Sequence, residues 1–164
     1  MAKPFTFELL GKRHKRDAFA CGVEPLDRYF QQQVTQDVRR LATACYVAIE
    51  VASGRVAGYY TLAAGAVLLS GLPPELAKKL PRYPDVPVAR LGRLAIDLGF
   101  QRRKLGAAML WDAVLRSKRS EVAVYGLVVE AKDDNAVAFY ERHGFTMLSV
   151  GQRQLVLPLA GINP

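Results

Sequence analysis

Long apolar runs are missing from this 164-residue chain. The longest, Leu62–Leu69, includes a glycine and is far shorter than the about 20 residues that a membrane-spanning helix needs. The N-terminal segment carries Lys3 but no apolar stretch followed by a cleavage site, so we expect no signal peptide. These absences predict a cytoplasmic protein that makes no contact with a membrane.

Cysteine is also scarce. Cys21 and Cys45 have neither metal-ligand spacing nor a partner set for a disulfide framework, so we expect two reduced, buried side chains and no metal site. The glycine motifs GxGxxG and GxxxxGK[ST] do not occur, and their absence speaks against NAD and ATP as ligands.

Acidic residues are fewer than basic ones: the chain has 15 Asp and Glu residues and 23 Lys and Arg residues, which gives a net charge of +8. Such a surplus indicates an anionic partner, either nucleic acid or a phosphate-rich cofactor. The alternative is that these cations only face solvent and bind no partner. The cations gather in three groups: Lys12, Arg13, Lys15 and Arg16; Lys78, Lys79, Arg82, Arg90 and Arg93; and Arg102, Arg103 and Lys104.

A hydrophobic content of 51% with 23% charged residues predicts one globular domain over residues 1–164. The patterns predict mixed α and β structure. We expect helices over 26–40, 73–80, 105–119 and 133–144, a rigid loop over 81–87, and strands over 5–9, on both sides of Ser53-Gly54 within 44–69, and over 88–97, 122–131, 145–150 and 153–159.

The stretch "QRRKLGAAML" (101–110) follows a predicted strand and opens a predicted helix. A helix N-terminus offers unpaired N–H groups and a positive dipole end to a phosphate. Small residues at Gly106, Ala107 and Ala108 allow close approach to the main chain. The alternative is a basic helix start that simply faces solvent.

This stretch, the preceding "RLGRLAID" and the later "DDNAVAFYERHGF" together resemble the acetyl-CoA site of the GNAT superfamily of N-acetyltransferases. The resemblance implies an α+β fold in which helices flank a central, mostly antiparallel sheet with a splayed strand pair. It implies Tyr140 as the general acid and no metal. The residues it implies for binding acetyl-CoA are Leu94, Ala95, Ile96, Gln101, Arg102, Arg103, Lys104, Leu105, Gly106, Ala107, Asn135 and Phe139.

Lys104 departs from the family pattern, which has glycine there. Glycine tolerates a positive φ and close approach of a ligand, and lysine does not. We expect the substitution to cost main-chain freedom, and we expect the ammonium group to offset that cost by facing a phosphate.

"FACGVEPLDRYF", "GYYTLAAGAV" and "LPRYPDVPVARLGRLAID" narrow the resemblance to the GNAT toxins of bacterial toxin–antitoxin modules. It implies acetyl transfer to the α-amino group of aminoacyl-tRNA, which blocks translation. It also implies a ribbon-helix-helix antitoxin and a homodimer. The residues expected at the tRNA are Lys78, Lys79, Arg82, Tyr83, Arg90 and Arg93, with Arg93 nearest the 3′ end and Tyr83 stacked on a base.

Other interpretations remain open from the residues alone. Tyr140 could pack beside Ala136 and Phe139 without a catalytic role, and Asn135 could be only a helix N-cap. The acceptor could be a protein N-terminus or a small-molecule amine, or the chain could be a non-catalytic module that binds acyl-CoA or nucleic acid. We further expect His143 to favour a helix C-terminus. Trp111, Met109 and Leu110 are expected on the buried face of their helix.

Overall fold

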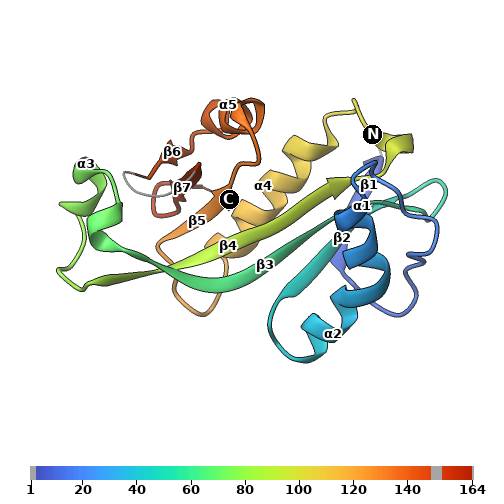
Figure 1. Ribbon diagram of the computed structural model, residues 1–164, viewed down its shortest axis with the longest axis horizontal. Helices are drawn as coiled ribbons and strands as arrows, with labels where there is room; N and C mark the ends of the chain where they lie inside the picture. Colours follow the sequence, from blue (N-terminus) through green and yellow to red (C-terminus); the bar gives the residue numbers. More distant parts are fainter. Residues whose placement is uncertain (1–2, 149–152, 164) are drawn as a thin grey trace. The chain divides into compact units, whose positions relative to one another are not determined.

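The structure is a computed structural model that describes residues 3–148 and 153–163. The chain divides into two compact units. Unit 1 contains Met1–Ala63 and Gly92–Ala113, and unit 2 contains Ala64–Leu91 and Val114–Pro164. The α-helices and strands of the two units are labelled in Figure 1, and each unit is described by itself. Within the described residues, no helix is both long enough and apolar enough to cross a bilayer.

The strands of unit 1 form an antiparallel arrangement around a tight hairpin. Strand β1 (Phe5–Leu9) pairs with β2 (Ala44–Glu50), which pairs with β3 (Val56–Leu68). Gly54 turns the hairpin with a φ of 72°, a value that glycine adopts without strain. The Asp97 amide, directly after β4 (Asp85–Ile96), donates to the Ala57 carbonyl at 2.9 Å. The predicted first strand and hairpin are confirmed.

One helical run covers this hairpin in unit 1. It consists of α1 (Glu24–Arg28), a π-helical turn η1 (Tyr29–Gln33) and α2 (Val34–Arg39). Phe30 and Val34 are fully buried in one cluster with Val47 and Tyr59. The run confirms the predicted helix over 26–40. The π turn was not predicted, although strict four-residue spacing drifts by about 40° per step on a 3.6-residue helix, and a wider turn compensates for that drift.

Helix α4 (Leu105–Lys118) follows a single turn of 3-10 helix, η3 (Leu98–Phe100). In unit 1, Met109 and Leu110 are buried as predicted. The prediction for Trp111 was wrong, because its side chain is 48% exposed. Three consecutive helix residues span about 200° of the helix circumference, so they cannot all share a narrow buried face.

The described residues of unit 2 include a parallel strand pair next to antiparallel ones. Residues Val88–Leu91 of β4 pair in parallel with Gly126–Val129 of β5 (Gly126–Glu130), and β7 (Gln154–Pro158) pairs antiparallel with both β5 and β6 (Thr146–Met147). The registered β4–β5 pairing ends at Leu91 and Val129, one residue before β5 itself ends at Glu130. The mixed, mostly antiparallel fold class is confirmed.

Some predicted boundaries in unit 2 differ. The helices η2 (Leu69–Gly71), α3 (Pro74–Ala77) and α5 (Asp134–Arg142) include the expected short helix at Pro74. Strand β4 begins inside the predicted loop, at Asp85, because Val86 and Val88 alternate as buried residues on either side of exposed Pro87. Strand β5 begins only at Gly126, and Val122 before it is exposed. The last residues of the predicted 145–150 strand, 149 and 150, lie outside the described residues.

Candidate active site

The loop before α4 in unit 1 has an unusual backbone. Arg102 has a φ of 66° and Lys104 a φ of 60°, both in the left-handed region that glycine favours. Position 104 therefore has the conformation that suits the glycine of the family pattern, and lysine adopts it here. The same conformation at Arg102 was not predicted, because no preference of arginine indicates it.

The four side chains of this loop divide into two pairs. Gln101 donates its amide to the carbonyl oxygens of Cys21 and Ile96, each at 3.0 Å. Arg103 lies 3.5 Å from the Glu50 carboxylate and stacks over the Phe100 ring. Arg102 and Lys104 are exposed. Gln101 and Arg103 thus hold the loop in place within unit 1, and Arg102 and Lys104 extend their charges into solvent.

The start of α4 is closely packed against the end of β4. Leu105 is buried, and a Cβ placed on Gly106 would lie 3.3 Å from Cδ1 of Ile96. The first amides of an α-helix have no partner within the helix. The main chain of Leu105, Gly106 and Ala107 therefore presents donors of the kind that bind phosphate. Of the three β4 residues predicted for the cofactor, Ala95 is buried, and Leu94 and Ile96 are half-buried.

Tyr140 lies on α5 in unit 2, inside a group of aromatic rings. Its ring centroid is 5.3 Å from that of Phe139 and 5.5 Å from that of Phe145. Burial raises the pKa of the Tyr140 hydroxyl above its ordinary value, so the group keeps its proton at neutral pH. A protonated phenol is the form that a general acid requires.

The two ends of α5 test the expectations for Asn135 as the helix N-cap and for His143 at the helix C-terminus. Asp133 is the N-cap, and its carboxylate accepts from the Ala136 amide at 2.8 Å. Asn135 lies inside the helix and is exposed, so the N-cap alternative for Asn135 was wrong. His143 is the C-cap residue, and its Nδ1 lies 2.7 Å from the Phe139 carbonyl oxygen.

The predicted tRNA-contacting residues differ in exposure and in their contacts within the protein. In unit 2, Lys78, Lys79, Arg82 and Tyr83 are exposed, Tyr83 to 70%. Arg90 instead packs on Gly65 and donates to the Ala66 carbonyl at 3.2 Å. In unit 1, the Arg93 guanidinium carbon lies 3.5 Å from the centroid of the Tyr29 ring.

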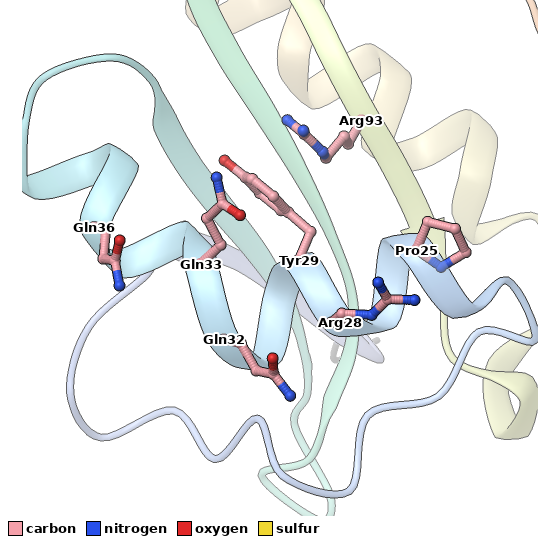
Figure 2. Close-up of a pocket in the computed structure, with 7 residues that line it drawn as sticks. All are labelled: Pro25, Arg28, Tyr29, Gln32, Gln33, Gln36 and Arg93. Atoms are coloured by element: carbon pink, nitrogen blue, oxygen red, sulfur yellow. The ribbon is translucent and has the colours of Figure 1, made fainter.

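Arg93 and Tyr29 form part of a pocket that sequence reasoning did not find. The pocket has a volume of roughly 360 Å³, within the range of small-ligand sites. Figure 2 shows Tyr29 and Gln33 extending from the helical run toward Arg93 on β4. The π turn places both residues, because Tyr29 and Gln33 are its first and last members. The remaining polar side chains that line the pocket are Arg28, Gln32 and Gln36.

The described part of the chain contains no group of side chains that could bind a metal ion. Within residues 3–148 and 153–163, no three His, Cys, Asp or Glu side chains gather in a way that could hold a metal ion. Cys21 and Cys45 are both buried free thiols, as expected. Burial raises the pKa of the Cys21 thiol and raises that of the Cys45 thiol to about 12, so neither position offers a thiolate at neutral pH.

Comparison with known proteins identifies the family. Residues 82–156 match the model of the acetyltransferase (GNAT) domain. The chain is 31% identical over 142 residues to the "tRNA-acetylating toxin" of Mycobacterium tuberculosis (strain ATCC 25618 / H37Rv), an alignment that covers 85% of this chain and 83% of that toxin. The chain belongs to the GNAT acetyltransferases. The fold and the enzyme class implied by its sequence motifs are therefore confirmed.

Solved structures of GNAT toxins are similar to this acetyltransferase. One is AtaT complexed with acetyl-methionyl-tRNAfMet, at 30% identity and a TM-score of 0.86 over 94% of each chain. Another is a mutant AtaT toxin bound to the C-terminus of the antitoxin AtaR and acetyl-CoA, at 26% identity and a TM-score of 0.77 over 96% of this chain and 94% of that chain.

Proposed function

We propose that this acetyltransferase is a toxin that moves an acetyl group from acetyl-CoA to the α-amino group of an aminoacyl-tRNA and so blocks translation. The observation that carries the proposal is the similarity to the tRNA-acetylating toxin of M. tuberculosis over 83% of that toxin's length. The AtaT structures, with an acetylated aminoacyl-tRNA and with acetyl-CoA, support the same reaction.

Unit 1 has the features that a diphosphate-containing donor needs. The left-handed residues Arg102 and Lys104 turn the chain into α4, whose first amides bind phosphate oxygens. The exposed Arg102 and Lys104 side chains add positive charge, while Gln101 and Arg103 keep the loop in shape. We assign Leu94–Ile96 and Leu105–Ala107 to the donor through their main chain, and Asn135 and Phe139 of unit 2 as additional contacts.

Tyr140 supplies the proton that the departing thiolate takes up. The amine forms a bond to the acetyl carbon and releases one proton to solvent, while the carbon–sulfur bond breaks and leaves a thiolate. Tyr140 donates its hydroxyl proton to that thiolate and regains a proton from solvent, and its raised pKa keeps the hydroxyl in the acid form. The acceptor needs no strong enzymatic base, since a free α-amino group has a pKa of about 7.7–8.0 and is partly neutral near pH 7.

The basic residues suit a polyanionic acceptor. Lys78, Lys79 and Arg82 are exposed on unit 2, next to exposed Tyr83. We assign these cations to tRNA phosphates and Tyr83 to stacking on a base. Arg90 keeps its assignment as a tRNA contact, although part of its guanidinium group is engaged by the Ala66 carbonyl.

The AtaT–AtaR complex supports an antitoxin as a partner of this chain. We propose a ribbon-helix-helix antitoxin, a homodimeric toxin and a cytoplasmic location, which is where aminoacyl-tRNA is used. Co-expression with the product of the neighbouring reading frame tests the first point: induced toxicity should disappear when an antitoxin is present.

A transfer assay with purified components tests the reaction. Radiolabelled acetyl-CoA is incubated with charged tRNA, with the same tRNA deacylated, and with a polyamine. Label should move to charged tRNA alone. Label on the polyamine, or on deacylated tRNA, would assign a different acceptor, and binding of acetyl-CoA without any transfer would indicate a non-catalytic module.

A further inference from the structure

Thr61 of β3 is a buried hydroxyl that bonds the main chain of the neighbouring strand in unit 1. Its side chain is 1% exposed, and its Oγ1 accepts a hydrogen bond from the main-chain amide of Arg93 on β4 at 3.0 Å. The ladder bonds of a sheet run from main-chain amides to main-chain carbonyl oxygens. A side-chain acceptor therefore ties β4 to β3 at this one residue, and the tie depends on the type of residue at position 61.

Gly92 makes room for this bond. A Cβ placed on Gly92 would lie 2.8 Å from Oγ1 of Thr61, which is closer than side chains approach one another. Threonine is branched at Cβ and has few rotamers, so its buried hydroxyl cannot easily turn away. The hydroxyl of Thr61 and the missing side chain of Gly92 thus form a matched pair that fixes β4 directly before Leu94.

Main-chain groups alternate in direction along the end of β4. The amides of Arg93 and Asp97 both donate toward β3, and successive residues of a strand direct their amides to opposite edges. The amides of Leu94 and Ile96 therefore face the edge away from β3. In the described part of the chain, the registered pairing of β4 on that edge ends at Leu91, so these two residues present main-chain groups without a registered strand partner.

We infer that Thr61 is a positioning residue for the acetyl donor. It touches neither donor nor acceptor. Its hydroxyl holds Arg93, and through Arg93 it sets where the main-chain groups of Leu94 and Ile96 meet the amide groups of acetyl-CoA. The inference rests on the proposed assignment of Leu94–Ile96 to the donor and names the side chain that keeps this strand end in place.

Three substitutions of Thr61 test this role through the affinity for acetyl-CoA, measured by titration calorimetry. Thr61→Val replaces the hydroxyl with a methyl group, which cannot approach the Arg93 nitrogen to 3.0 Å and pushes β4 away. We expect the dissociation constant to rise about tenfold, the loss of one donor hydrogen bond. Thr61→Ala removes the acceptor without the push and should raise it about fivefold. Thr61→Ser keeps the hydroxyl and should bind acetyl-CoA like wild type.

Thr43→Val is the matched control for a purely structural effect. The Thr43 hydroxyl donates to the Leu62 carbonyl of β3 at 2.9 Å, directly before β2, so this variant also loses a side-chain bond to the main chain of the sheet. We expect it to lower the unfolding midpoint and to leave the affinity for acetyl-CoA unchanged. Wild-type affinity in Thr61→Val and Thr61→Ala, or a loss of affinity in Thr61→Ser as large as in Thr61→Val, would overturn the inference.

Hydrogen exchange tests the bond itself and does not require a variant that binds the donor. The Arg93 amide should exchange faster in Thr61→Ala than in Thr61→Ser or wild type, because only alanine leaves it without the hydroxyl acceptor. Equal exchange in all three proteins would contradict the tie between β3 and β4.

The inference and the proposed reaction fail in different ways. If Thr61→Val loses affinity for acetyl-CoA and Thr61→Ser keeps it, but the wild type acetylates no aminoacyl-tRNA, the role of Thr61 stands and the proposed acceptor is wrong. If the wild type acetylates aminoacyl-tRNA and all Thr61 variants bind acetyl-CoA normally, the reaction stands and Thr61 serves only the stability of the sheet.

Discussion

Position 104 shows how one residue can be unfavourable for the backbone and useful for the ligand. A non-glycine residue in the left-handed region costs about 1–2 kcal/mol, and Lys104 has a φ of 60°. The sequence identified this position because the family pattern has glycine there. Arg102 has the same conformation and was not identifiable, since arginine has no local preference that marks it.

Lys104→Gly and Lys104→Ala separate the two effects, because both remove the charge and only glycine relieves the conformation. We expect Lys104→Gly to be more stable than Lys104→Ala by about 1 kcal/mol in denaturant unfolding. Both should bind acetyl-CoA more weakly than wild type. Equal stability of the two variants would show that the left-handed conformation carries no strain.

Tyr140→Phe removes the proposed proton donor and keeps the ring packing against Phe139 and Phe145. We expect kcat to fall by about 100-fold or more, with little change in affinity for acetyl-CoA. Tyr125→Phe is the matched control, since Tyr125 also has a pKa raised by burial and is not assigned to the site. A Tyr140→Phe enzyme with wild-type turnover would contradict the role of Tyr140.

The pH dependence follows from the same residue. Because burial raises the pKa of Tyr140 above its ordinary value, its acid form persists as the pH rises. The rate should therefore increase through the pKa of the substrate amine and then level off. Single-turnover rates between pH 6 and 9 measure this, and a falling limb below pH 9 would exclude Tyr140 as the acid.

At the scale of elements, most helices and strands were predictable from the sequence. The features that depend on contacts between residues far apart in the chain were not predictable. The helix over 26–40 was predictable from Leu26, Phe30, Val34 and Val38, while its π turn was not. The pocket was not predictable either, since it needs Arg93 from β4 to stack on Tyr29 from the helical run. Trp111 was placed in the core because apolar type alone does not define the direction of a side chain.

The N-cap of α5 gives a prediction at this scale. Asp133→Ala removes the hydrogen bond to the Ala136 amide and should destabilise the protein by about 1 kcal/mol. Asn135→Ala, two residues further on and exposed, should change the stability little. Urea unfolding of both variants measures the difference, and an equal loss in the two would restore Asn135 as a capping residue.

For the whole molecule, the net charge of +8 dominates the encounter with tRNA. Binding of a polyanion through several Lys and Arg side chains releases counterions, so the affinity should fall steeply with salt. We expect the dissociation constant for tRNA to rise at least about tenfold between 50 and 200 mM salt, while that for the acetyl-CoA donor rises much less. Equal salt dependence of the two ligands would count against an extended cationic tRNA surface.

The identity of the acetylated group tests the central claim most directly. After reaction of aminoacyl-tRNA with acetyl-CoA and the enzyme, nuclease digestion releases the 3′-terminal aminoacyl-adenosine, and mass spectrometry determines its composition. We predict one acetyl group, attached to the α-nitrogen of the amino acid and formed at least about 100-fold more slowly when Tyr140 is replaced by Phe. An unmodified aminoacyl-adenosine, or an acetyl group on a nucleoside or a ribose hydroxyl, would contradict the account.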